Sequence, residues 1–529
     1  MPVFGSQWLA ATDSTYEIDQ SIRFNDDDSA FLARTPSASN RKTWTFSCWV
    51  KRANLFNGSV PQILLSAGDG GSNDFIMQFG QSDDTLRISD YEGSTQSNLI
   101  TTQLFRDVGA WYHFVLAYDT TQGTAANRIK LYVNGSQVTE FGTETYPSQD
   151  NDLVINSAIA HNIGRGAYSS NGYFDGYLAE INFIDGTALT PSSFGETDSS
   201  TGQFIPKKYS GSYGTEGYYL KGESSSDLGN DSSGNNNDFS SSGLATADQM
   251  SDSPTNNHCT LNPLITPATM TFADGNLALS GYTASTSAYG TFGLSSGKWF
   301  WQIVAQANAM AGIAATPNGS QYPGQASDSY AMDLTNGTKY NNGSSATYGS
   351  GEITAGNVIG VGFDADAGTL KFYDSDGNDI GTAYSSLTSG PYFPVFRNGN
   401  SANISINFGQ TGAFTFTPSG YKALNTSNLA DPQVENPSAY FHTQLYSGNS
   451  TSGHSITNNA QAGDFQPDWI IFAPRSNGDH HNVIDAVRGS DRRMQTNNTT
   501  AEQTDDPALF TFESNGFDID TTDVNYYGS

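Results

Sequence analysis

Paired carboxylates are the first arrangement in this sequence that could perform chemistry. Some glucanases carry Glu-x-Asp-x-x-Glu on a single strand, so that a general acid and a nucleophile flank the sugar bond. The nearest match here is Glu180-Ile-Asn-Phe-Ile-Asp185. Asn182 stands where the middle carboxylate should be, and on a regular strand Asp185 points away from the face that Glu180 and Asn182 share. We therefore expect no enzymatic activity.

Histidines and cysteines could bind metals or act in catalysis, but their positions favour neither role. Four of the seven histidines lie near the C-terminus in turn-rich sequence, which predicts exposed loop positions; they are His442, His454, His480 and His481. The two cysteines, Cys48 and Cys259, can form neither a disulfide framework nor a four-thiolate zinc site. Cys48 lies within a strand-like run and is predicted to be a buried, reduced thiol.

Two acidic clusters could bind Ca²⁺, which prefers hard oxygen ligands. The first is Asp26-Asp27-Asp28 and the second is Asp374-Ser-Asp376-Gly377. The second lacks the spacing of an EF-hand loop, because its glycine comes too early. Aspartates that cap their own backbone in tight turns also explain both clusters. We retain Ca²⁺ as a hypothesis at Asp26, Asp27 and Asp28, and we expect no other cofactor.

Aromatic side chains are the stronger candidates for ligand binding. Trp49 is predicted to lie on the otherwise polar face of its strand, and Tyr168 and Tyr173 flank the turn Ser169-Ser-Asn-Gly172. Sugar rings stack on exposed aromatic faces, because their C–H groups meet the negative face of the ring. Packing of Trp49 against a neighbouring strand or domain is the alternative.

The charge balance argues against two classes of partner. The chain has 529 residues, with 23 lysines and arginines against 53 aspartates and glutamates, so its formal net charge is −30. Such a surface repels phosphate backbones and anionic lipid headgroups, so we expect neither nucleic acid nor a membrane surface as partner. The chain shows no run of ~18 apolar residues and no signal-peptide pattern at its N-terminus, so we expect no membrane insertion.

Alternation of apolar and polar residues dominates the chain and predicts β-strands. In Thr43–Lys51 one face carries Trp44, Phe46, Cys48 and Val50. Residues Trp111–Tyr118 are apolar on both faces, which predicts a central strand, and Ile129–Val133 ends in an Asn134-Gly135 hairpin turn. A helical period is absent over any long stretch. We expect an all-β protein with few, short helices.

Two breaks in this pattern divide the chain. Residues 223–257 are rich in Ser, Asn and Gly and poor in apolar residues, and so predict an extended connector. Residues 431–437 contain two prolines. The expected order is an N-terminal arm at 1–15, a first domain at 16–222, a connector at 223–259, a second domain at 260–430, a linker at 431–437 and a third domain at 438–529.

The first domain resembles the laminin-G-like branch of the concanavalin A-like β-sandwiches. The resemblance rests on four segments in order: Phe46–Lys51, Trp111–Asp119, Ile129–Gly135, and Ile163-Gly-Arg with Phe174–Phe183. It implies a jelly roll of two packed antiparallel sheets. Relatives in this branch often bind Ca²⁺, which is a further reason to inspect Asp26–Asp28.

The second domain resembles a SPRY domain, also an antiparallel β-sandwich. The matching segments are Gly297–Ile303, Gly356–Asp364, Gly368–Tyr373, Tyr392–Val395 and Ile404–Gly409. Ile359, Val361 and Phe363 are expected to share one core with Leu370 and Phe372. The resemblance places Tyr322, Tyr330 and Tyr340 in loops where SPRY domains contact partners.

The third domain resembles a module of unassigned function found in virion-associated proteins of tailed bacteriophages. The matching segments are His442–Gly448, Phe465–Ile471, Val483–Gly489 and Ser514–Phe517. A clear closing strand is missing before Ser529, so this module is expected either to be completed by another chain or to be incomplete here. The domain order resembles appendage or fibre proteins of marine phages.

This resemblance implies a non-enzymatic virion protein that attaches to a host-surface receptor, preferably a glycan, through loops and sheet faces. Expected partners are other virion proteins and copies of the chain itself, with a trimer as the working hypothesis. One alternative is a decorating protein of capsid or tail that contacts virion proteins alone. Another is a polysaccharide depolymerase, which would need two carboxylates roughly 5–9 Å apart in a groove.

Overall fold

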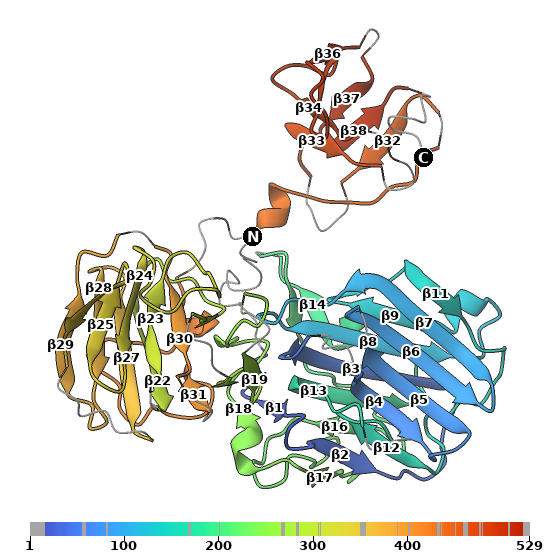
Figure 1. Cartoon of the computed structure of the whole chain (residues 1–529). Coiled ribbons are helices and arrows are strands. Elements are labelled where there is room, and N and C mark those ends of the chain that lie inside the picture. The colour runs from blue at the N-terminus through green and yellow to red at the C-terminus, as the bar shows by residue number, and fades with distance from the viewer. Residues whose placement is uncertain are drawn as a thin grey trace. The chain divides into compact units, whose positions relative to one another are not determined.

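The chain folds into antiparallel β-sheets, and its helices are single turns (Figure 1). This computed structural model describes residues 16–55, 60–80, 83–167, 171–199, 201–265, 270–281, 285–304, 306, 308–349, 356–388, 390–399, 403–430, 434, 436–449, 451–458, 464–474, 478, 480–505 and 508–521. The helices found there are 3₁₀ turns: η2 (Ala125–Asn127), η3 (Pro191–Ser193), η4 (Thr246–Asp248), η5 (Thr426–Asn428) and η6 (Pro437–Ala439). A helix that could span a membrane is absent from this part of the chain. The expected all-β fold class is confirmed.

Two compact units make up the chain. Residues 1–196 and 204–432 form one unit, which contains both sandwiches, and residues 197–203 and 433–529 form the other. The boundary near residue 432 falls within the expected linker at 431–437. Residues 431–433 and 435 of this linker lie outside the described residues, and so does the expected N-terminal arm at 1–15.

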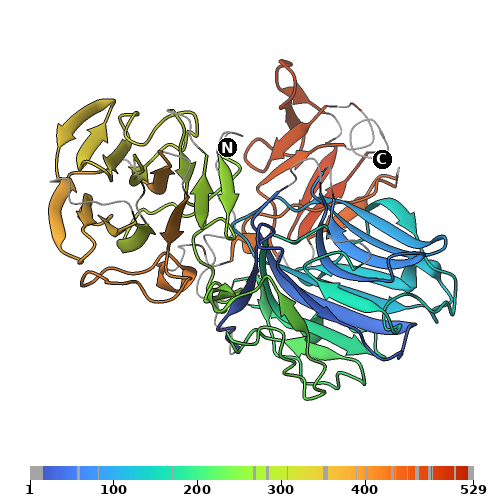
Figure 2. The same cartoon turned by 60° about the horizontal axis from the view of Figure 1, so that its bottom comes forward.

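The first sandwich consists of two stacked sheets (Figure 1 and Figure 2). One of them, called the inner sheet below, contains in order β10 (Ser136–Gln137), β9 (Ile129–Val133), β8 (Tyr112–Asp119), β3 (Thr43–Arg52), β13 (Gly176–Asp185), β1 (Ser21–Phe24) and β18 (Gln249–Met250). In the same sheet β16 (Tyr218–Leu220) also pairs with β13. The second sheet contains β11 (Phe141–Thr145), β7 (Thr95–Leu104), β6 (Thr85–Glu92), β5 (Asn73–Phe79), β4 (Gln62–Gly68), β12 (Ala160–Ile163), β2 (Phe31–Arg34) and β17 (Ser240–Ser242). A small hairpin joins β14 (Gly195–Thr197) to β15 (Phe204–Pro206).

The predicted alternation in β3 builds the core of the first sandwich. Trp44, Phe46, Cys48 and Val50 are all buried between the two sheets. The predicted hairpin between β9 and β10 is also present: Asn134 and Gly135 have φ angles of 46° and 82°, as a two-residue hairpin turn requires. β8 is buried on both faces, as expected for a central strand.

The outer face of the inner sheet is covered as well, which the sequence pattern did not predict. Trp49 and Lys51 point outward from β3 but are 4% and 0% exposed. Side chains from distant segments cover this face, among them Ile18, Trp111 and Met250. β3 is therefore buried on both faces.

The expected extended connector at 223–259 is wrong, because this stretch folds onto the first sandwich. β17 adds to the edge strand β2, and β18 pairs with β1. The carboxylate of Asp231 accepts hydrogen bonds from the backbone N–H groups of Tyr219, Ser233 and Asn237 at 2.8–2.9 Å. Polar side chains therefore satisfy the backbone here, so the stretch needs little apolar surface of its own.

The second sandwich follows the predicted SPRY-like pattern. One sheet contains, in order, β19 (Thr271–Ala273), β20 (Ala278–Ser280), β31 (Ile404–Asn407), β22 (Lys298–Val304), β27 (Val358–Asp364), β28 (Thr369–Tyr373) and β29 (Asp379–Tyr384). The other contains β21 (Ala288–Tyr289), β30 (Phe393–Arg397), β23 (Met310–Ala314), β24 (Ser329–Asp333), β25 (Thr338–Asn341) and β26 (Ser344–Thr347). Val361 is opposite Phe372 and Phe363 is opposite Leu370 in one buried core, as predicted.

The C-terminal unit contains two small sheets. One has the order β32 (His454–Thr457), β38 (Gly516–Ile519), β37 (Phe510–Glu513), and the other has the order β33 (Trp469–Phe472), β34 (Asn482–Asp485), β35 (Arg492–Gln495), β36 (Gln503–Thr504). Its core is a small cluster around Phe472, Phe510 and Phe517. Trp469 and Ile471 on β33 remain about half exposed.

Candidate ligand-binding site

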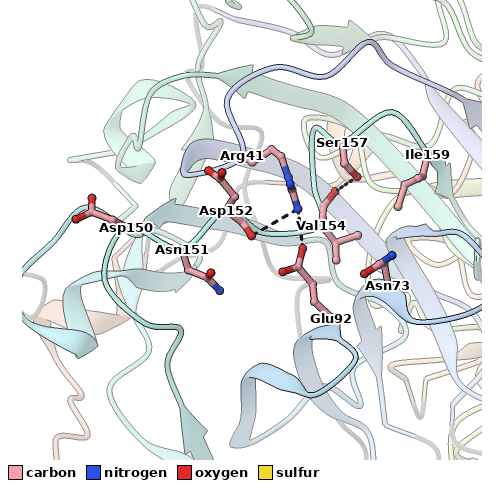
Figure 3. A pocket seen from close by; sticks show the side chains of 9 residues that line it. All are labelled: Arg41, Asn73, Glu92, Asp150, Asn151, Asp152, Val154, Ser157 and Ile159. Carbon is pink, nitrogen blue, oxygen red and sulfur yellow. Dashed lines mark hydrogen bonds and ion pairs between the residues drawn. The ribbon is translucent and has the colours of Figure 1, made fainter.

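A polar cleft of about 640 Å³ opens at one end of the first sandwich (Figure 3). Three strand ends and one loop form it: the residues before β3, the start of β5, the end of β6, and the loop from β11 to β12. Its volume is in the range of small-molecule sites. The lining residues are Arg41, Asn73, Glu92, Asp150, Asn151, Asp152, Val154, Ser157 and Ile159.

Arg41 holds the wall of the cleft together. Its Nη2 lies 2.6 Å from Glu92 Oε1, and its Nε donates to the carbonyl of Leu153 at 2.5 Å. The same guanidinium also approaches the carbonyl of Asp152, as Figure 3 shows. Arg41 therefore fixes the loop from β11 to β12 against the end of β6, so the polar groups of the loop are positioned in advance.

Asp90 is bonded to Val154, one of the lining residues, and is itself fully buried. Its Oδ2 accepts a hydrogen bond from the backbone N–H of Val154 at 3.1 Å, while its Oδ1 has no partner. Burial raises the pKa of Asp90 to about 7; the charge of Glu92 acts in the same direction, and the Val154 N–H and Arg41 oppose it. The carboxyl therefore changes charge near neutral pH.

The lining suits a ligand with many hydroxyl groups. Arginine, amide and hydroxyl groups offer donors, and three carboxylates offer acceptors, so the charged groups of the lining carry a net charge of −2. Val154 and Ile159 are the apolar members, and the lining includes no aromatic ring. Binding here would rest on directed hydrogen bonds rather than on ring stacking.

The sequence did not single out this cleft, because its residues come from four separate segments. The polar run Ser148–Asp152 was a weak signal for a loop. Only the pairing of the strands brings that loop to the ends of β5 and β6.

Trp49 is not an exposed sugar-binding platform, so that interpretation is wrong, and the alternative, packing against neighbouring segments, is confirmed. Its ring lies 4.7 Å from the ring of His113 and 6.2 Å from that of Phe204. Trp49 packs with Ile18, Trp111 and neighbouring residues in a buried cluster. The alternation placed it correctly on the outer face, but distant segments cover that face.

Of the two loop tyrosines in the first sandwich, Tyr168 lies outside the described residues. Tyr173 is half-buried, and its ring centre lies 6.4 Å from that of Phe31. The guanidinium of Arg165 sits 3.6 Å above the Phe31 ring and 5.9 Å from that of Tyr173. Arg165 thus occupies one aromatic face that a sugar would need.

The three tyrosines of the second sandwich were expected to lie in loops, but only one of them does. Tyr330 belongs to β24 and packs against Tyr384 and Tyr392 at the edge of the core, so its assignment to a loop is wrong. Tyr340 belongs to β25. Only Tyr322 lies in a loop, where its ring meets that of Tyr340 edge-on at 6.3 Å.

The acidic cluster Asp26–Asp28 forms the turn between β1 and β2. The N–H of Ser29 donates to the carbonyl of Asp26 at 3.0 Å, and the carboxylate of Asp28 accepts from Asn25 Nδ2 at 2.8 Å. Asp26 is half-buried, whereas Asp27 and Asp28 are exposed. Among the residues that the structure describes, no three histidine, cysteine, aspartate or glutamate side chains form a group that could hold a metal ion.

The second acidic cluster caps its own turn, which was the simpler of the two interpretations. Asp374 Oδ1 accepts hydrogen bonds from the backbone N–H groups of Asp376 and Asn378 at 3.0 and 2.8 Å. These and the Asn378 amide oppose the effect of burial and keep the pKa of Asp374 below its usual value. The C-terminal histidines are exposed or half-buried and are distributed over separate segments.

Glu180 lies on an irregular part of its strand, so the regular-strand geometry assumed for Glu180 and Asn182 does not hold. A bulge interrupts the pairing of β13 with β3 between Ala179 and Asn182, and Glu180 has a φ of 51°. Its carboxylate accepts hydrogen bonds from the hydroxyls of Tyr16 and Tyr219. Burial raises its pKa, and these two hydrogen bonds oppose the rise.

Two serine arrangements that sequence reasoning missed also lack the setting of a nucleophile. Gly293-Leu-Ser-Ser-Gly297 matches Gly-x-Ser-x-Gly, but it leads into β22 rather than into a helix, which a nucleophile elbow requires. Ser47 Oγ lies 2.9 Å from His113 Nε2, but both residues are buried. Burial lowers the pKa of His113 to about 3.

Comparisons with known families identify the two sandwiches. Residues 24–193 match the concanavalin A-like lectin/glucanase superfamily, in its laminin G model, and residues 298–411 match the SPRY domain. Residues 436–529 match a domain of unknown function, DUF7483. The chain thus carries a concanavalin A-like domain and a SPRY domain in tandem, as the sequence resemblance predicted.

Individual relatives are more distant. Protein ssh4 of Neurospora crassa is 34% identical over 104 residues, which is 19% of this chain and 20% of that protein. The SPRY domain of human HERC1 is similar over 28% of this chain and 96% of its own, with 19% identity and a TM-score of 0.24. Stonustoxin is similar over 28% of this chain and 26% of its own, with 20% identity and a TM-score of 0.24. The chain thus spans about a fifth of ssh4 and about a quarter of stonustoxin.

Proposed function

We propose that this chain is a non-catalytic binding protein whose first sandwich recognises a surface glycan in the polar cleft around Arg41 and Glu92. The observation that carries this proposal is the lining of the cleft: it is mostly polar, with charged, amide and hydroxyl donors and acceptors beside the apolar Val154 and Ile159. Lectin-like and SPRY sandwiches are binding folds, which supports the same reading. The fold alone does not determine the ligand, so the proposal rests on the chemistry of the cleft.

A shallow polar cleft binds one sugar weakly, because hydrogen bonds to the ligand replace hydrogen bonds to water. Many copies of the chain on one particle would raise the overall affinity without new contacts. We therefore extend the proposal to a virion appendage of a tailed phage that attaches to its host. The likeness of the C-terminal module to virion-associated proteins supports this extension.

A glycan array tests the binding step. Asp152 lines the cleft, its side chain is 58% exposed, and its ion pair with Lys42 is long, at 4.0 Å. Asp152→Ala should therefore reduce glycan binding at least fivefold without unfolding the protein. Glu223→Ala is the matched control, because Glu223 is 64% exposed and also forms one surface ion pair, with Lys221.

Three outcomes would contradict the glycan proposal. Absence of binding by the wild-type protein would favour a decorating protein that contacts virion proteins alone. Equal loss in both variants would indicate nonspecific charge effects. Release of shortened oligosaccharides would indicate a depolymerase. Mass spectrometry of purified particles tests the virion assignment separately, and absence of the chain from them would refute it.

A further inference from the structure

The side-chain donors in the polar cleft of the first sandwich are already engaged within the protein. The guanidinium of Arg41 is paired with Glu92 at 2.6 Å. The neutral donors of the lining are the side-chain amides of Asn73 and Asn151 and the hydroxyl of Ser157. At 2.6–3.0 Å, their respective acceptors are Asp69 Oδ2, Gln96 Oε1 and the carbonyl of Val154. Every side chain of the lining that can donate a hydrogen bond thus has an internal acceptor.

Two carboxylates of the same lining remain available to a ligand. Asp150 and Asp152 belong to the loop from β11 to β12, and both are exposed (Figure 3). Among the residues that the structure describes, none donates a hydrogen bond to the carboxylate of Asp150. The carboxylate of Asp152 faces Lys42, but the Lys42 Nζ is 4.0 Å away, which is beyond hydrogen-bond distance. Both carboxylates can therefore accept hydrogen bonds from a ligand.

The charge of the cleft favours the same kind of ligand. The lining has a net charge of −2. Its two charged neighbours, Lys42 beside Asp152 and Asp69 beside Asn73, cancel each other and leave that charge unchanged. At about 0.15 M salt the Debye length is about 8 Å, so a ligand in contact feels these carboxylates more strongly than distant charges of the chain.

We infer that the glycan bound in this cleft is an amino sugar, with its free ammonium group against the carboxylates of Asp150 and Asp152. This inference rests on the proposed function and specifies the class of sugar. An ammonium group offers several donors and no acceptor, so it complements a lining whose free groups are acceptors. Hydrogen bonds between an ammonium and a carboxylate are charge-assisted and about twice as strong as neutral ones.

The same lining discriminates against other glycans. A uronate or sulfate group would lie beside carboxylates of its own charge, which costs affinity. Acetylation of an amino sugar removes the positive charge and leaves a single N–H on the nitrogen. The cleft should therefore bind amino sugars most tightly, N-acetylated sugars less tightly and acidic sugars least.

Calorimetric titration of the full chain with three tetrasaccharides tests this order. A chitosan tetramer and a chitin tetramer share one backbone, but the amines of chitin are acetylated, and a galacturonate tetramer is the acidic ligand. At mildly acidic pH, where the sugar amines are protonated, the chitosan tetramer should bind at least about tenfold more tightly than the chitin tetramer. The galacturonate tetramer should not bind. Spermidine, a cation without a sugar ring, should bind more weakly than the chitosan tetramer.

Two variants locate the interaction in the cleft. Asp152→Asn keeps the shape of the side chain but removes its charge, so affinity for the chitosan tetramer should fall about fivefold. Asp150→Asn should have a similar effect, and asparagine tolerates the φ of 60° at this position. Glu223→Gln is the matched control, because it removes one exposed negative charge that does not line the cleft. This control should bind like the wild type.

The inference is overturned if the chitin or galacturonate tetramer binds as tightly as the chitosan tetramer. Equal affinity for spermidine would also overturn it, because the cleft would then recognise charge alone, and so would equal losses in Asp152→Asn and Glu223→Gln. The proposed function would survive these results if Asp152→Asn weakened binding of another glycan. If no tetramer binds and the glycan array is empty as well, both the inference and the proposed function fail.

Discussion

Lys51 offers a direct test of how the first sandwich is joined to the segment that follows it. Its ammonium is 0% exposed and donates to Asp252 Oδ2 and Asn257 Oδ1 at 2.7 Å, and to the carbonyl of His258 at 2.8 Å. Asp252 is also fully buried and accepts from Trp111 Nε1 at 3.1 Å. The substitution Lys51→Met keeps most of the side-chain volume but removes the charge.

The expected cost is large because one partner is left behind. Removing one member of a buried ion pair typically destabilises a protein by about 3–5 kcal/mol, since the other charge remains buried without compensation. Two further acceptors, Asn257 Oδ1 and the His258 carbonyl, also lose their donor, which places the expected loss toward the upper end. Lys51→Met combined with Asp252→Asn should lose less than Lys51→Met alone, because the orphaned charge is gone.

Urea denaturation followed by tryptophan fluorescence measures these free energies of unfolding. Lys371→Met is the matched control: its ion pair with Asp379 has a similar length, 2.6 Å, but lies at the surface, so about 0–1 kcal/mol should be lost. A loss below about 1 kcal/mol for Lys51→Met would refute the reasoning. The reasoning would also be refuted if the double variant Lys51→Met/Asp252→Asn lost as much free energy of unfolding as the two single variants lose together.

Three further predictions concern buried groups. Because burial raises the pKa of Asp90 to about 7, the folded chain binds more protons than the unfolded chain between about pH 4 and pH 7, so this group lowers stability as pH rises through that window. Asp90→Asn should remove that fall. Its free energy of unfolding relative to wild type should therefore grow by about 3 kcal/mol from pH 4.5 to pH 8, and a constant difference would contradict the assignment. Trp49→Ala should cost about 3–5 kcal/mol in urea denaturation and leave glycan affinity unchanged; loss of affinity with little loss of stability would restore Trp49 as a ligand contact. Cys48 and Cys259 are buried free thiols, and burial raises the pKa of each. A thiol reagent should therefore label neither of them before the chain unfolds, which mass spectrometry can show. Rapid labelling of the folded chain would contradict this prediction.

The individual strands were largely predictable because a strand is defined by local alternation. The core face of β3, the two buried faces of β8 and the hairpin at Asn134-Gly135 all follow from residues close together in the chain. The pairing of β27 with β28 was predictable for the same reason. Two failures have a common cause: Trp49 and the stretch 223–259 were judged by their own composition, yet residues far away in sequence decide what covers them.

The sequence by itself determined that the chain is all-β and which face of β3, β27 and β28 enters the core, because the alternation of side chains along a strand is a local rule. Its resemblance to known families indicated a laminin G-like and a SPRY-like sandwich. Only the tertiary structure decided where polar groups converge. The cleft at Arg41 combines several distant segments, and no single segment carries a pattern for it. The physical reason is that strand pairing brings loops from distant parts of the chain to the same end of a sandwich, so a site can form without any motif in the sequence.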